Sequence, residues 1–177
     1  EPIDANAGGL PFGGLTIVSG PAKLGKSTLL LRLHSEFAKA GRHTAFFSLE
    51  MSKELAKLRL LQIEHLTKKQ MSFIHVLDEP MREHQVYAEA MRLAAEYKIE
   101  MIGVDYASKM LQGRPAGVES MSNIYAAMGD LAKNPRIPVI LIAGVSRGYI
   151  GGEADVNHIW YSGQAEHEAS LIIIIHN

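Results

Sequence analysis

A glycine-framed lysine at residues 20–27 is the part of this sequence with the clearest chemical meaning. The stretch GPAKLGKS satisfies the pattern G-x-x-x-x-G-K-[ST], whose glycines let the backbone wrap a phosphate with its N–H groups pointing inward. In that pattern Lys26 reaches the β and γ phosphates, Ser27 offers its hydroxyl to Mg²⁺, and Thr28 lies beside the α phosphate. ATP and Mg²⁺ are therefore the expected ligands. The expected nucleotide-binding residues are Gly20, Pro21, Ala22, Lys23, Leu24, Gly25, Lys26, Ser27 and Thr28.

Two acidic residues close apolar runs further along the chain. Asp105 ends MIGVD, and Glu50 ends TAFFSLE. A phosphate loop needs a second metal ligand at the end of a neighbouring strand, and hydrolysis needs a group that takes a proton from the attacking water. We therefore expect Ser27 and Asp105 to hold Mg²⁺, and Glu50 and Lys26 to act in catalysis. The simpler alternatives are a helix cap or turn for Asp105 and a solvated acid before a helix for Glu50.

The elements that must position these residues alternate between apolar strands and amphipathic helices. Repeated strand–helix units predict an α/β fold with a mostly parallel sheet and helices on both faces. Strands are expected over residues 15–19, 44–49, 72–77, 100–105, 137–143 and the final SLIIIIH. Helices are expected from Lys26 to a glycine cap at Gly41, from Ser52 to about His65, and over about 81–97 and 120–133.

Some details of these elements are specific enough to be checked. We expect Ser52 to be the N-cap of its helix, with Leu55, Leu58 and either Leu60 or Leu61 facing inward. The run LIIII at 171–175 is expected to be a buried strand, and residues 106–119 a loop. The glycine-rich stretch at 144–155 is expected to be mobile.

Composition excludes several classes of protein. The net charge is -1, so no overall field draws the chain to nucleic acid or an anionic membrane. The absence of cysteine excludes disulfides and thiolate metal sites and fits a reducing compartment, so the cytoplasm is expected. The longest apolar run is far shorter than the roughly 20 residues that span a bilayer, so no membrane association is expected. At 177 residues the chain is expected to form one domain.

Five segments, in order along the chain, together resemble one family. These are GGLPFGGLTIVSGPAKLGKSTL, FFSLEMS, IGVDY, IPVILIAGVSR and SGQAEHEASLIIII. The chain is similar to the RecA-like motor domain of the DnaB-type replicative helicases of bacteria and phages. The resemblance implies a hexameric ring around single-stranded DNA, formed by self-association of a longer parent protein, with ATP bound between subunits.

The resemblance also bears on three arginines. Arg59 occupies a position at which the family has arginine, which implies a nucleotide contact; a solvated helix face is the alternative. Arg114 and Arg147 lie in loops and are the few basic residues available to meet DNA, although loop arginines are more often solvated.

Several positions depart from the family pattern. Ala143 and Gly144 stand where the family has a polar residue and a sensor glutamine. His158 and Trp160 replace an acidic and a basic residue, and His167 replaces a glutamine. The family's arginine finger lies beyond its last matching strand. We therefore expect residues 1–177 to be a single motor domain that lacks its N-terminal collar and C-terminal tail, with slow hydrolysis.

Three functions compete on this reading. The first is an ATPase motor on single-stranded DNA. The second is a RecA-like nucleotide-binding module that regulates or assembles partners and hydrolyses ATP slowly or not at all. The third, a small-molecule kinase with a phosphate loop, would need an arginine-rich lid, and the sequence shows no such segment.

Overall fold

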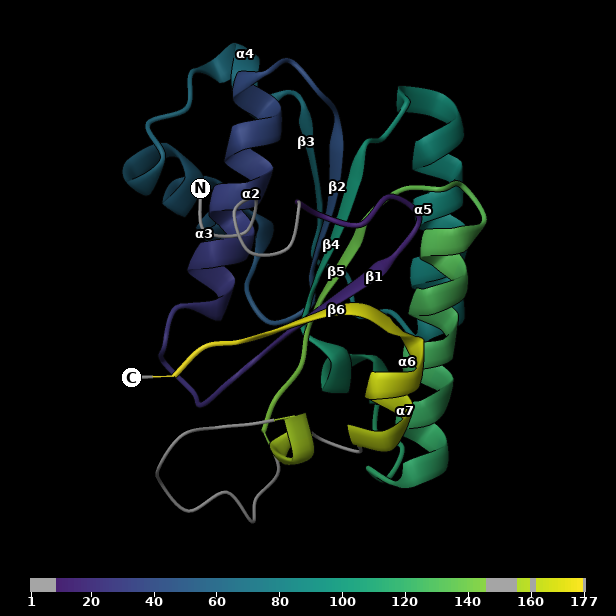
Figure 1. Cartoon of the computed structure of the whole chain (residues 1–177). Helices are drawn as coiled ribbons and strands as arrows, with labels where there is room; N and C mark the ends of the chain where they lie inside the picture. Colours follow the sequence, from purple (N-terminus) through teal and green to yellow (C-terminus); the bar gives the residue numbers. More distant parts are fainter. Residues whose placement is uncertain (1–8, 146–155, 160–161, 177) are drawn as a thin grey trace.

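A parallel β-sheet is the central layer of the molecule, as a computed structural model that describes residues 9–145, 156–159 and 162–176 shows (Figure 1). The described strands are β1 (Leu15–Ser19), β2 (Thr44–Ser48), β3 (Ile74–Leu77), β4 (Met101–Asp105), β5 (Val139–Ile142) and β6 (Ala169–Ile174). Their order is β3-β2-β4-β5-β1-β6, and every pairing is parallel. The predicted α/β fold is confirmed. Because the strands are parallel, their carboxyl ends meet at one edge of the sheet.

Helices cover both faces of this sheet (Figure 1). On one face lie α2 (Lys26–Lys39), α3 (Lys53–Ile63) and the short α4 (Lys68–Met71). On the other lie α5 (Glu83–Tyr97) and α6 (Val118–Lys133), with α7 (Ser162–Glu168) packed against α6. The 3-10 helices η1 (Ala107–Leu111) and η2 (Val156–His158) lie in connections. The two helical layers enclose two separate apolar cores.

Strand β4 shows how the sequence sorts side chains between the two cores. Ile102 and Val104 pack into the core under α5 and α6, whereas Met101 packs into the core under α2 and α3. Successive side chains of a strand point to opposite faces, so Gly103 and Asp105 share the face of Met101. Asp105 is thereby directed to the side of the sheet on which α2 begins.

Helix α2 ends as the sequence predicts. Its C-cap is Ala40, and the following Gly41 has φ +73°, a left-handed conformation that glycine adopts without steric penalty. The Gly41 N–H donates to the carbonyl of Ala38. The inward stripe of this helix contains both aliphatic and polar residues, namely Leu30, Leu31, His34, Ser35 and Ala38.

Helix α3 confirms one expectation and corrects another. The Ser52 side chain accepts a hydrogen bond from the Leu55 N–H at 3.3 Å, so Ser52 is the N-cap. The expectation that Leu55, Leu58 and Leu61 face inward is wrong: their side chains are 41%, 47% and 43% exposed. The helix instead packs through Ala56 and Leu60, the latter having been the open alternative to Leu61. Ala56 and Leu60 are four residues apart and therefore lie on one face of the helix, so the leucines on its other faces point outward.

The LIIII run is also not the buried strand that its composition predicts. Strand β6 lies at the edge of the sheet, where β1 is its one neighbour among the described strands, so residues 171–175 are half-buried. Strand order, which the sequence does not specify, decides this burial. At its end, the Ile175 N–H donates to the Ser19 carbonyl at 2.8 Å, which ties β6 to the start of the glycine-framed loop.

The segment expected to be a loop at 106–119 contains regular structure. Its first part forms η1, whose Ala107, Met110 and Leu111 are buried, and α6 begins at Val118. Apolar side chains at three-residue spacing suit a 3-10 turn, which is too short to be recognised as a periodic pattern. The stretch expected to be mobile at 144–155 lies mostly outside the described residues. In the part of the chain that the structure describes, no helix has the length and apolarity to cross a membrane.

Candidate nucleotide-binding site

The loop between β1 and α2 carries the glycine-framed motif, and its backbone requires glycine at two positions. Gly25 is the N-cap of α2 with φ +89°, and a Cβ there would meet nothing within 4 Å, so the requirement is conformational. Gly20 has φ +144°, and a Cβ there would collide with the Ile175 carbonyl oxygen. The loop therefore brings bare backbone to the N-terminus of α2, where free N–H groups and the helix dipole favour an anion.

Lys26 folds back onto this loop. Its Nζ donates to the carbonyl oxygens of Gly20 at 2.7 Å and Pro21 at 2.6 Å. Burial lowers the pKa of the Lys26 ammonium, and the negative charges of Asp105 and Glu50 oppose that shift. The ammonium thus lies at the centre of the loop, with two acidic groups near it. A phosphate would replace the two carbonyls as its partner.

Asp105 has the properties of a metal ligand. Its carboxylate is buried, and neither oxygen has a hydrogen-bond partner of good geometry among the described residues. Burial raises its pKa; the Ser27 hydroxyl nearby and the positive charges of Lys26 and Arg59 act in the opposite direction, while Glu50 adds to the rise. A buried carboxylate without a partner is unfavourable unless a ligand satisfies it. Together with the Ser27 hydroxyl it supplies the hard oxygen donors that Mg²⁺ prefers, so these residues fit the ion.

Glu50 lies in a turn that is held at several points. The Leu49 N–H donates to the Asp105 carbonyl at 2.8 Å, and the Ser48 hydroxyl donates to the Met51 carbonyl at 2.7 Å. The Lys53 N–H donates to the Asp78 carboxylate at 2.7 Å, which fixes the start of α3. The Glu50 side chain is exposed, so its carboxylate is free to contact water in the cavity.

One cavity of about 620 Å³ collects most of the residues predicted to form the site. Nearly all of the predicted phosphate, metal and catalytic residues line it. The predicted residues in its wall are Gly20, Ala22, Lys23, Gly25, Lys26, Ser27, Thr28, Glu50, Arg59 and Asp105. Pro21 and Leu24 belong to the loop but not to the wall. Arg59 arrives from α3, which explains why its charge acts on Asp105.

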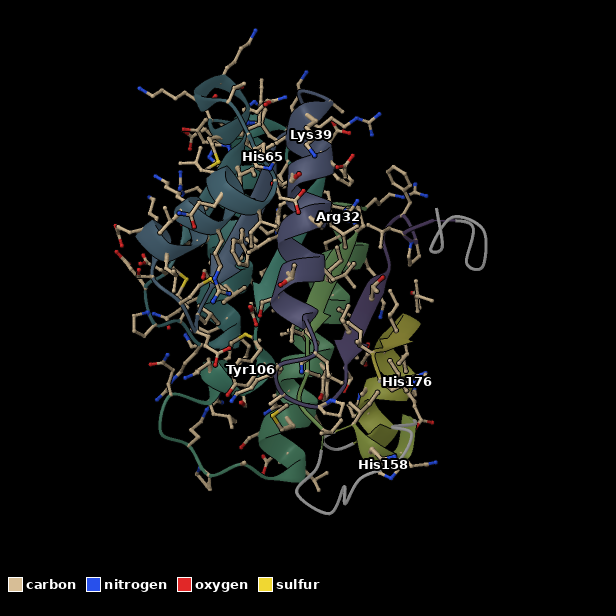
Figure 2. The ribbon with its side chains drawn as sticks, turned by 90° about the vertical axis from the view of Figure 1, so that its left-hand side faces the viewer. Arg32, Lys39, His65, Tyr106, His158 and His176 are labelled. Carbon is tan, nitrogen blue, oxygen red and sulfur yellow. The ribbon has the colours of Figure 1, made fainter. Side chains whose placement is uncertain are left out.

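Four further residues line the cavity, and three of them were not proposed from the sequence. Tyr106, Ile142 and Val145 were missed, and Gly144 was noted only as a departure from a family pattern. Figure 2 shows Tyr106 at the end of the sheet where α2 begins. The signal that finds them is topological. Residues at or just after the carboxyl end of β4 or β5 border a site formed at that edge.

The two arginines proposed to meet DNA lie outside this cavity or outside the described residues. Arg114 donates from Nη1 to the Glu83 carboxylate at 2.9 Å, forms an ion pair with it, and donates to the carbonyls of Met110 and Leu111. These contacts join η1 to α5. A DNA contact by Arg114 stays a prediction and would compete with them. Arg147 and Trp160 fall outside the described residues.

Metal sites of another kind are not evident. The described residues contain no cluster of three or more His, Asp or Glu side chains suited to a metal ion. The carboxylate of Glu168, on α7, accepts hydrogen bonds from Lys133 Nζ at 3.4 Å and from the Gln164 side chain at 3.1 Å.

The model of one protein family matches the chain over residues 1–72 and 62–177; its description is "DnaB-like helicase C terminal domain". The "Replicative DNA helicase DnaB" of Treponema pallidum (strain Nichols) is 27% identical over 201 residues, which cover 98% of this chain and 46% of that protein. The protein of the same name from Nostoc sp. strain PCC 7120 is 32% identical over 173 residues, which cover 82% of this chain and 20% of that protein. The chain therefore spans less than half the length of either relative.

A solved structure supports the fold independently of the sequence. The structure titled "The Structure Of A DnaB-Like Replicative Helicase And Its Interactions With Primase" superposes with a TM-score of 0.82 at 14% identity. The match covers 98% of this chain and 49% of that one. At this level of identity the similarity establishes the fold alone.

Proposed function

The chain belongs to the family of DnaB-like helicase C-terminal domains, and on that premise we propose that it binds and hydrolyses Mg-ATP as a motor acting on single-stranded DNA. The observation that carries the proposal is the convergence of Lys26, Ser27, Glu50 and Asp105 on one cavity. They come from three separate segments, and each has the chemistry that phosphoryl transfer to water requires.

Binding of the triphosphate rests on the loop and on Lys26. In the proposal, the ammonium exchanges its contacts with the Gly20 and Pro21 carbonyls for contacts with the β and γ phosphates. Backbone N–H groups at the start of α2 complete the cradle. Ser27 and Asp105 would hold Mg²⁺. When bound, the ion neutralises charge on the phosphate oxygens.

The chemical step rests on Glu50 and on positive charge. The exposed Glu50 carboxylate borders the cavity, so it can orient a water and accept its proton as that water attacks the γ phosphate. Lys26 and Arg59 supply positive charge on the cavity wall, where negative charge develops in the transition state. We also propose that residues 1–177 form a single motor domain. A longer parent protein would assemble into a ring around single-stranded DNA.

The proposal is tested by separating binding from turnover. We expect Glu50→Gln to retain the affinity for a fluorescent ATP analogue and to lower the ATPase rate about 100-fold, since an amide cannot take the proton. Glu54→Gln is the matched control, because Glu54 is exposed at the start of α3 and does not line the cavity. Equal losses of binding and turnover in Glu50→Gln would contradict the assignment of Glu50 as base.

The metal assignment has a control of its own. We expect Asp105→Asn to abolish the Mg²⁺ dependence of nucleotide affinity and Asp78→Asn to leave it unchanged. Asp78 accepts the Lys53 N–H at the start of α3, so its replacement affects stability instead. If Asp78→Asn had the larger effect on Mg²⁺ dependence, the metal site would be wrongly assigned.

A second candidate function is a nucleotide-binding module that regulates partners and turns over slowly. Ala143 is fully buried and Gly144 lines the cavity without a side chain, so β5 ends without a polar group there to contact the γ phosphate. ATPase measurements with and without oligo-dT distinguish the two functions. DNA-stimulated turnover supports the motor, and unstimulated slow turnover supports the module.

A further inference from the structure

In the contact between α2 and β4, a buried histidine lies on a glycine. His34 is seven residues after Ser27 in α2, and Gly103 is two residues before Asp105 in β4. The two residues proposed to hold the metal thus lie on the same two elements as this contact: Ser27 precedes His34 in α2, and Asp105 follows Gly103 in β4. Nothing in the proposed chemistry uses His34 itself.

His34 is fixed in position. It is fully buried, and its Nδ1 shares a hydrogen bond of 2.8 Å with the Thr44 hydroxyl on β2. Its ring packs against Phe46 with centroids 4.9 Å apart. Nε2 has no hydrogen-bond partner among the described residues. Burial lowers the pKa of His34 to about 3, so the ring is neutral at physiological pH.

Gly103 leaves the space that the His34 ring fills. A Cβ at residue 103 would clash with His34 Nε2 and would lie 3.2 Å from His34 Cε1 and 2.8 Å from Leu30 Cδ1. Contacts of this kind require α2 or β4 to move, because both side chains are fully enclosed. The His34 ring and Leu30 therefore approach β4 more closely than a side chain at residue 103 would allow.

We propose that His34 and Gly103 are positioning residues, and that their contact sets the separation of α2 and β4 at which Ser27 and Asp105 share one Mg²⁺. The helix carries Ser27 on roughly 10 Å of rigid backbone beyond His34, at 1.5 Å per residue. The strand carries Asp105 about 7 Å beyond Gly103. Because both stretches of backbone are rigid, a change in the separation of α2 and β4 at this contact also changes the distance between Ser27 and Asp105.

This inference rests on the proposed Mg-nucleotide binding, so its test measures affinity rather than turnover. The affinity of a fluorescent ATP analogue is measured in Mg²⁺ and in EDTA for wild type, His34→Ala, Gly103→Ala and the double variant, with thermal unfolding alongside. We expect each single variant to lose about tenfold in Mg²⁺-dependent affinity while affinity in EDTA changes less than about twofold. The double variant should recover most of that loss, because the added methyl group occupies space that the ring has left.

Gly163→Ala is the matched control, since a Cβ at this exposed position would meet nothing within 4 Å. If Gly103→Ala does not fold, the comparison of His34→Ala with the double variant still reports the rescue. Folded single variants with wild-type Mg²⁺ dependence would overturn the inference and leave the proposed function intact. So would a double variant no better than His34→Ala. A wild-type protein whose nucleotide affinity does not depend on Mg²⁺ would overturn both this inference and the proposed function.

Discussion

The two helical layers of this protein differ in what they bury. Helix α6 buries seven residues, mostly large and apolar, including Tyr125 and Met128, and shares its core with α5 and η1. Helix α3 on the opposite face buries only Ala56 and Leu60. Beside it, α2 encloses the polar side chains of His34 and Ser35. The α5–α6 layer thus buries mainly large apolar side chains, whereas the α2–α3 layer also buries polar ones, and its helix α2 begins at the wall of the cavity.

This difference predicts that mutations in the two layers have separate consequences. The largest effect is expected in the α5–α6 layer. Met128 is fully buried, and Met128→Ala is expected to lower the free energy of unfolding by about 2–5 kcal/mol, because a cavity remains where its side chain was. Denaturant titration measures this loss. Nucleotide affinity below the unfolding transition should stay within about twofold of wild type, and a large change in affinity would contradict the separation of the two layers.

The next effect is expected at the start of the α2–α3 layer. Lys26→Ala should weaken ATP binding by about 100-fold or more, since it removes a charged partner of the phosphates. The free energy of unfolding should not fall, because burying part of the charged ammonium is itself unfavourable and the variant removes that cost. Lys39→Ala changes the same residue type at the far end of α2, as Figure 2 shows, and should leave affinity unchanged. Equilibrium titration of both variants decides the point; unchanged affinity in Lys26→Ala would remove the basis of the site.

A pH dependence follows from the polar core of the α2–α3 layer. The pKa of His34 is about 3 in the folded protein and 6.5 ordinarily, so the unfolded chain binds the extra proton between these values. The free energy of unfolding is therefore unaffected by the titration of His34 above pH 6.5 and decreases as pH falls toward 3. At pH 5 the decrease is about 2 kcal/mol. Unfolding curves of wild type and of His34→Asn, which cannot titrate, measure this difference. Parallel pH profiles of the two proteins would show that His34 is not buried as a neutral ring.

The smallest effect is expected on the outer face of α3. Leu58 is 47% exposed, so Leu58→Gln should change stability by less than about 0.5 kcal/mol. Leu60→Ala, two residues away in a fully buried position, should destabilise by about 2–5 kcal/mol. Similar losses in the two variants would restore the original expectation that Leu58 faces the core.

The origin of that wrong expectation explains what sequence patterns leave out. A run of leucines at helical spacing indicates an apolar face, but α3 contains two such faces, one through Ala56 and Leu60 and one through Leu55 and Leu58. The partner surface selects between them. In the same way, an uninterrupted apolar strand indicates burial on both faces, and only the strand order shows that β6 lies at an edge.

The grouping of the candidate residues around one cavity follows from the sequence more directly than these packing details, although their roles stay predictions. The loop from Gly20 to Thr28 depends on local chemistry, since left-handed backbone at Gly25 and a charge at Lys26 are properties of single residues at fixed spacing. Glu50 and Asp105 were found because parallel strands end at one edge of a sheet. Tyr106, Ile142 and Val145 escaped because they carry no distinctive chemistry and border the cavity only through the neighbours of their strands.

The sequence by itself therefore determined the alternation of strands and helices, the glycine-framed loop between β1 and α2, and the acidic residues that end two of the neighbouring apolar runs, because these are encoded in short stretches and in backbone preferences. Tertiary structure alone decided that β6 is an edge strand, that Arg114 is paired with Glu83, and that His34 lies on Gly103. Each of these depends on contact between residues far apart in the chain. No local pattern specifies such contacts, because they arise only when whole elements pack together.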